Sequence, residues 1–175
     1  NNINAGAINN IQFNADNSGA GGPTLTGKGF IAGGISDTAG LIFTDSAAIT
    51  GADLATLNFD NVDVLNIRST STDAVKGGLG TANVNVVSSL VATDLDVLNV
   101  TGDQGFSVTL GAGTTSLTVV DASASTGGLG FSAAAVAITT LNVKGSTSAG
   151  AMGGDTINVS NATTSATIQG NAGGD

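Results

Sequence analysis

The residues best suited to chemistry in this chain are two aspartates that each follow a pair of glycines. Glycine permits tight turns whose carbonyl oxygens point inward, and the aspartate adds an anionic oxygen to the same turn. Carbonyl and carboxylate oxygens are the ligands that Ca2+ takes in proteins. We therefore predict a calcium site at each turn, formed by Gly153 with Asp155 and by Gly173 with Asp175. The alternative is an ordinary turn in which the aspartate hydrogen-bonds its own backbone.

A second candidate for a cation site is the pair Asp94 and Asp96. Side chains two residues apart in an extended strand point to the same side, so these two carboxylates would share a face. Two neighbouring carboxylates could bind a hard cation such as calcium. The alternative for this pair is a charged strand face that is simply in contact with water.

Catalysis has little support in the composition. The chain has no His, Cys, Tyr or Glu, so aspartate is the one remaining side chain among the usual general bases. Two aspartates could act together as in glycosidases, but such sites also need basic or aromatic residues that grip the sugar. The chain has four Lys and Arg residues in total, and no Trp or Tyr. We predict that it is not an enzyme.

The charge distribution also restricts the partners. The formal net charge is -9, and the four basic residues are scattered singly along the chain. Such a surface repels phosphate groups, so we expect no nucleic-acid partner. No stretch approaches the roughly 20 apolar residues of a membrane-spanning helix, so we expect no membrane insertion. Because the chain opens on Asn1 without a methionine, we expect it to be a processed product or a segment of a longer chain.

The elements that must position these aspartates are short β-strands. Leu98-Asn99-Val100 repeats the earlier segment Leu65-Asn66-Ile67, and the alternation places the apolar residues on one face and Asn on the other. Weaker copies lie at 57–59, 117–119, 141–143 and 157–159. The helix formers Glu, Lys and Arg are nearly absent, and the one candidate helix is the Ala-rich run 132–137.

Recurrence of this segment predicts an all-β fold, a parallel β-helix or β-roll-like solenoid of short stacked strands. The spacing between copies is compatible with rungs of about 20 residues. Parallel stacking would also let equivalent Asn side chains pair amide to amide. The alternative is an antiparallel β-sandwich. We expect an N-terminal β segment at 1–50 that continues into a stacked-strand solenoid segment at 51–175.

Residues 150–158 match the calcium-binding pattern G-G-x-G-x-D-x-U-x, with Ala151 in place of the second Gly. Residues 170–175 repeat the pattern up to its Asp, with Asn171 in place of that Gly. Together with the Ser/Thr/Ala/Gly-rich run at 119–128, these turns give residues 57–175 a resemblance to the RTX (repeats-in-toxin) family of secreted bacterial proteins, especially its S-layer and giant-adhesin members. The resemblance implies type I secretion, calcium-dependent folding and a location at the cell surface.

The sequence thus predicts a structural protein, a calcium-stabilised segment of a self-assembling S-layer or extracellular filament. Its partners would be copies of itself in a lattice or filament, with surface polysaccharide as a further candidate. The alternative is an adhesin stalk or a glycan-binding module of a large secreted RTX-like protein.

Overall fold

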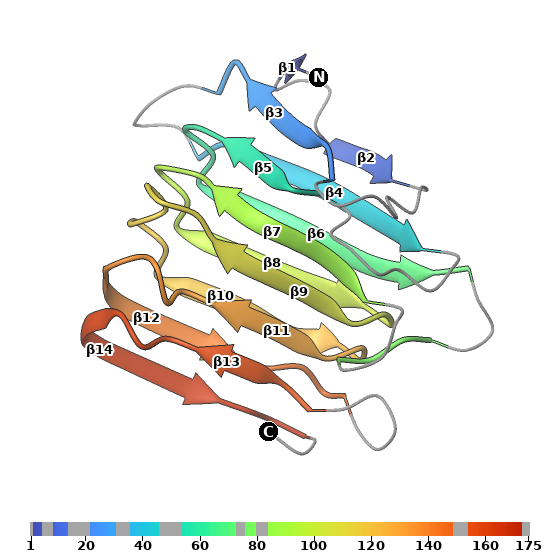
Figure 1. Ribbon diagram of the computed structural model, residues 1–175, viewed down its shortest axis with the longest axis vertical. Helices are drawn as coiled ribbons and strands as arrows, with labels where there is room; N and C mark the ends of the chain where they lie inside the picture. Colours follow the sequence, from blue (N-terminus) through green and yellow to red (C-terminus); the bar gives the residue numbers. More distant parts are fainter. Residues whose placement is uncertain are drawn as a thin grey trace.

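A computed structural model describes residues 2–4, 9–13, 22–30, 36–45, 54–72, 76–79, 84–148 and 154–172. Predicted site residues Gly153, Gly173 and Asp175 lie outside these ranges. Every regular element in the described part is a β-strand, and the strands form two sheets of seven. All strand pairings in both sheets are parallel (Figure 1).

Successive strands alternate between the two sheets. The first sheet, sheet A, contains the odd-numbered strands β1 (Asn2–Asn4), β3 (Thr24–Lys28), β5 (Thr56–Phe59), β7 (Asn85–Val91), β9 (Phe106–Leu110), β11 (Leu129–Ser132) and β13 (Thr156–Asn158). The second, sheet B, contains the even-numbered strands β2 (Asn9–Phe13), β4 (Thr38–Asp45), β6 (Val64–Ser71), β8 (Val97–Gly102), β10 (Val119–Ser125), β12 (Ile138–Lys144) and β14 (Ala162–Gln169). Each rung therefore contributes one strand to each sheet, which is the solenoid-like architecture predicted from the repeated segment.

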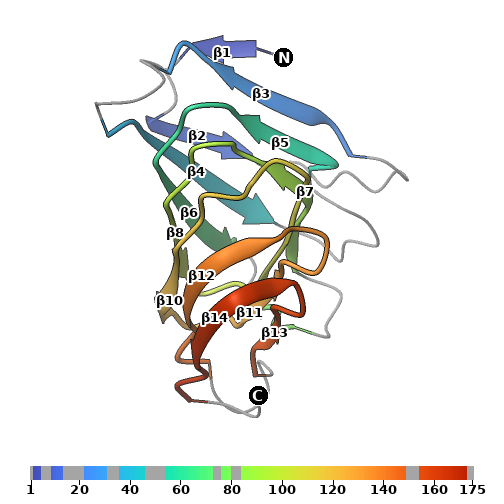
Figure 2. The ribbon, with the colours of Figure 1, turned by 90° about the vertical axis from the view of Figure 1, so that its left-hand side faces the viewer.

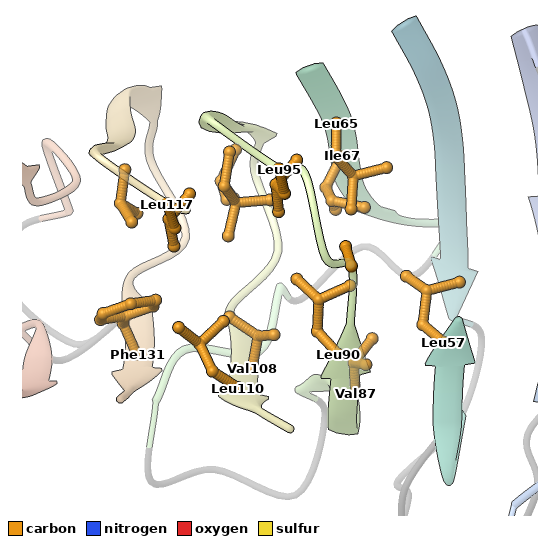
Figure 3. Packing of buried hydrophobic residues seen from close by; sticks show 14 of the residues in the cluster. Leu57, Leu65, Ile67, Val87, Leu90, Leu95, Val108, Leu110, Leu117 and Phe131 are labelled. Carbon is orange, nitrogen blue, oxygen red and sulfur yellow. The ribbon is translucent and has the colours of Figure 1, made fainter. Parts of the chain in front are cut away.

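The two sheets enclose one hydrophobic core (Figure 2). Leu98 and Val100 are fully buried, whereas Asn99 between them lies on the outer face, as the alternation predicted. Because the strands pair in parallel register, equivalent inward residues form columns along the stack. One such column in sheet B contains Ala39, Leu65, Leu98, Val120 and Val143. Leu95 and Leu117 lie just before strands β8 and β10. Their side chains point toward Val108, Leu110 and Phe131 of sheet A (Figure 3).

The Ala-rich run 132–137 is not a helix. Its chain turns between β11 and β12, and the Val136 N–H donates to the Ala133 carbonyl at 3.1 Å. A run this short is a marginal helix on its own. Burial of Ala133, Val136 and Ile138 in the core decides its path instead.

Sheet pairing continues across residue 50. Strand β3 pairs with β5, and β4 pairs with β6 from Thr38 to Asp45. Residues on both sides of this position therefore contribute to the same two sheets. The part of the chain that the structure describes contains no helix long and apolar enough to cross a membrane.

Candidate functional site

Asp155 lies where the chain passes from sheet B back to sheet A, directly before β13. Its neighbour Thr156 pairs with Gly130, so Asp155 lies beside Leu129 of the preceding rung. Thr156 is exposed, whereas Asp155 is only 7% exposed. The carboxylate is therefore directed into the interior of the stack rather than toward solvent.

Hydrogen-bond donors of the chain itself surround this carboxylate. The Ser146 N–H donates to Oδ2 at 2.7 Å, and the Ser146 hydroxyl donates to Oδ1 at 2.7 Å. The Leu129 N–H also donates to Oδ1, at 2.8 Å. A cation needs carboxylate lone pairs that face it, and these oxygens face donor hydrogens instead. Ser146 and Leu129 thus occupy three acceptor positions of the Asp155 carboxylate in the described part of the chain.

The predicted pair Asp94 and Asp96 lies just before β8, outside the regular strand. Asp94 is partly exposed in a turn, and Asp96 is exposed. The parallel register places Asp96 in a column with Asp63 and Asp37, because the residues that follow them, Val97, Val64 and Thr38, are Cα partners. Within this column the Asp37 N–H donates to Asp63 Oδ2 at 2.7 Å. This column was not predicted from the sequence, although the shared Asp-Val dipeptides at 63–64 and 96–97 are a signal for it.

This aspartate column does not amount to a metal centre by itself. Its main chain is fully engaged in rung stacking, since the Asp63 carbonyl accepts the N–H groups of Asp96 and Val97 at 2.9 and 3.0 Å. Among the described residues, no three side chains of the types His, Cys, Asp or Glu are grouped so as to hold a metal ion.

Two other aspartates form ion pairs on the outer surface. Asp121 accepts from Lys144 Nζ at 3.1 Å and from the Ser123 hydroxyl at 2.6 Å. The Ser123 hydrogen bond, with the Ser123 N–H and the Lys144 charge, lowers the pKa of Asp121 below its ordinary value of 3.8. Asp103 accepts from the Thr70 hydroxyl at 2.9 Å and lies 3.4 Å from Lys76 Nζ. These contacts join neighbouring rungs and leave the carboxylates with structural partners.

The outer face of sheet A carries a shallow groove of about 370 Å3. Uncharged residues line it, and we call it the sheet A groove: Leu79, Ser107, Val108, Thr109, Gly130, Phe131, Ser132, Thr156 and Asn158. Gly130 keeps its floor open, because a Cβ there would lie 2.8 Å from the Ser107 hydroxyl oxygen. The groove therefore offers neutral hydroxyl and amide groups to a ligand.

Comparison of the chain with protein-family models, with characterised proteins and with solved structures found no match.

Proposed function

We propose that this chain is a non-enzymatic structural protein, a calcium-stabilised segment of a self-assembling S-layer or extracellular filament at a bacterial cell surface. Its partners in this proposal are other copies of the same chain, stacked end to end. The observation that carries the proposal is the exposed end of the hydrophobic core at Ile168.

Ile168 extends an inward column of sheet B. It pairs with Val143, which is 1% exposed, and Val143 pairs with Val120, which is fully buried. Ile168 itself is 46% exposed. Among the described residues it is the large hydrophobic side chain that is exposed to solvent. A further rung stacked on β14 would bury this side chain, at a gain of roughly 25 cal/mol per Å2 of apolar surface.

The backbone at the same end supports this proposal. Strands β13 and β14 are the outermost strands of their sheets in the described part of the chain, and β1 and β2 are outermost at the opposite end. Outermost strands present backbone N–H and C=O groups that can pair with another strand. Pairing of β13 and β14 with the first rung of a second copy is a head-to-tail contact, which repeats without closing into a ring and so builds filaments.

Electron microscopy and sedimentation velocity of the chain test the proposal. We expect filaments or lattices that grow with protein concentration. Ile168→Asp should abolish them, because it places a charge where the next rung must pack. Thr167→Asp is the matched control, since Thr167 lies next to Ile168 but on the opposite face of β14. A wild-type chain that stays monomeric at all concentrations would contradict the proposal.

The calcium part of the proposal rests on the second glycine-aspartate turn of the sequence, Gly173 with Asp175, because the Asp155 carboxylate accepts hydrogen bonds from Ser146 and Leu129. Any ligand that binds only the folded state raises its melting temperature. We expect calcium to raise the Tm of the chain and a chelator to lower it. Assembly in chelator with an unchanged Tm would remove calcium from the proposal and leave the stacking intact.

A glycan-binding module is the second candidate, and the sheet A groove favours it. Neutral hydroxyl and amide groups can exchange hydrogen bonds with the hydroxyls of an uncharged sugar. A glycan array tests this candidate with Gly130→Ser, which should fill the groove and reduce binding. Binding that survives this substitution, or an array without any bound glycan, would contradict it.

A further inference from the structure

The corner between β12 and β13 contains more than a buried aspartate. Gly145 follows β12, and a Cβ on this residue would lie 1.9 Å from Asp155 Oδ2. The missing side chain lets the carboxylate approach the backbone where the Ser146 N–H donates to it. Ser146 itself is fully buried, and its hydroxyl also points at the carboxylate. Backbone N–H groups that converge in this way form a concave site for an anion.

Leu129 supplies the third side of this site from a different rung. Its N–H donates to Asp155 Oδ1. The carboxylate thus connects three segments: the start of β11, the end of β12 and the start of β13. A buried N–H without an acceptor costs free energy comparable to a lost hydrogen bond, so the two N–H groups need an anion or another acceptor here.

The equivalent position in an earlier rung is occupied by a side chain that donates hydrogen bonds instead of accepting them. Asn85 begins β7 and pairs in register with Phe106, which pairs with Leu129, so Asn85 and Asp155 belong to one inward column. Asn85 donates through Nδ2 to the Ser69 hydroxyl oxygen at 2.8 Å and to the Thr70 carbonyl. The earlier corner presents acceptors and receives an amide, whereas the later corner presents donors and receives a carboxylate. The polar side chain at each of these two positions thus complements the groups that its corner presents.

We propose that Ser146 and Leu129, with Gly145 beside them, form a carboxylate-binding site that the chain fills with its own Asp155. In this role Asp155 joins the rungs directly and without a metal ion, although its sequence context matches a calcium-binding turn. The proposal does not depend on self-assembly.

Chemical rescue tests this site. We expect Asp155→Ala to melt at least about 4 °C below the wild type, by the same amount in calcium and in chelator, because hydrogen bonds to a buried charge are lost. Sodium formate supplies a free carboxylate that fits the space left by the side chain. It should therefore raise the Tm of Asp155→Ala more than that of the wild type. Asp60→Ala is the matched control, since Asp60 is exposed and no rescue is expected there.

Two outcomes of this experiment would overturn the proposal. If Asp155→Ala matched the wild type in chelator and fell below it only in calcium, Asp155 would be a calcium ligand. If formate raised the Tm of all three proteins equally, the corner would have no specific carboxylate site. Hydrogen exchange of the wild type in chelator covers the case in which the variant does not fold. The amides of Leu129 and Ser146 should be protected, and rapid exchange of both would also overturn the proposal.

Discussion

The Asn99 side-chain amide donates from Nδ2 to Asn66 Oδ1 at 2.9 Å and joins the outer faces of two neighbouring rungs. The two residues are 33 positions apart in sequence and are Cα partners in the β6–β8 pairing. This contact is the amide pairing that we predicted for equivalent Asn residues in a parallel stack. Two equivalent residues of the sequence repeat are thus in direct contact between neighbouring rungs.

The amide pair should contribute measurably to stability. Asn66→Ala and Asn99→Ala each remove the contact, so the double variant should lose less than the sum of the two single losses. We expect a coupling of about 0.5–1 kcal/mol, since a hydrogen bond at the surface makes a small net contribution. Urea unfolding of the four proteins measures this coupling. Strictly additive losses would mean that the two amides do not support each other in solution.

The sequence predicted the inward faces of the main copies from their period of two. It favoured parallel stacking because the same apolar-Asn-apolar segment recurs, since a period of two is shared by parallel and antiparallel strands. It did not predict the register of the weaker copies. Segment 117–119 resembles 98–100, yet Val119 pairs with Val97, and Asn142 of segment 141–143 pairs with Val119. The offset of three at Val119 exchanges the two faces of the strand, so Val120 is buried and Val119 lies on the outer face.

The length of a rung was also underestimated from the sequence, because copies from the two sheets were compared with one another. Copies at 57–59 and 157–159 lie in sheet A, whereas those at 65–67 and 98–100 lie in sheet B. Their spacing in sequence therefore mixed half-rungs with whole rungs. The partners of Asp155 were likewise beyond sequence reasoning, because Leu129 lies 26 residues before it and contributes only a backbone N–H.

Truncating a side chain in the core should lower the free energy of unfolding far more than truncating one on the outer face. Leu98 is fully buried in the middle of its column, so Leu98→Ala should reduce the free energy of unfolding by about 2–5 kcal/mol. Val97→Ala is the control in the same strand, because Val97 lies on the outer face and is partly exposed. Chemical unfolding measures both. A loss below about 0.5 kcal/mol for Leu98→Ala would contradict its place in the core.

Lowering the pH should remove the contribution of Asp121 to the stability of the fold. Because the Ser123 hydroxyl, together with the Ser123 N–H and Lys144, lowers the pKa of Asp121 in the folded state, ionised Asp121 stabilises the fold above its unfolded pKa near 3.8. That stability is lost as the pH falls through the lower folded pKa. Asp121→Asn should therefore be less stable than the wild type at pH 7, with the gap closing below pH 3.8. Thermal melts across this range measure the gap, and a constant difference would contradict the assignment.

Two glycines with positive φ allow backbone strain to be separated from steric overlap. Gly102 has φ +111°, and a Cβ there would lie 1.8 Å from the Ser69 carbonyl oxygen of the neighbouring rung. Gly113 has φ +100°, but the nearest atom to a Cβ would be Thr93 Cγ2 at 3.8 Å. Gly113→Ala should thus carry the backbone strain alone, at about 1–3 kcal/mol.

Gly102→Ala should cost more than about 4 kcal/mol, since the added methyl group must also force β8 away from β6 at Ser69. Urea unfolding of the two alanine variants beside the wild type gives the comparison. Equal losses would show that the rungs separate at this corner without cost, and the close stacking of Gly102 on Ser69 would then not be a feature of the protein in solution. A larger loss for Gly102→Ala would establish that contact between rungs, rather than backbone conformation alone, requires glycine at the end of β8.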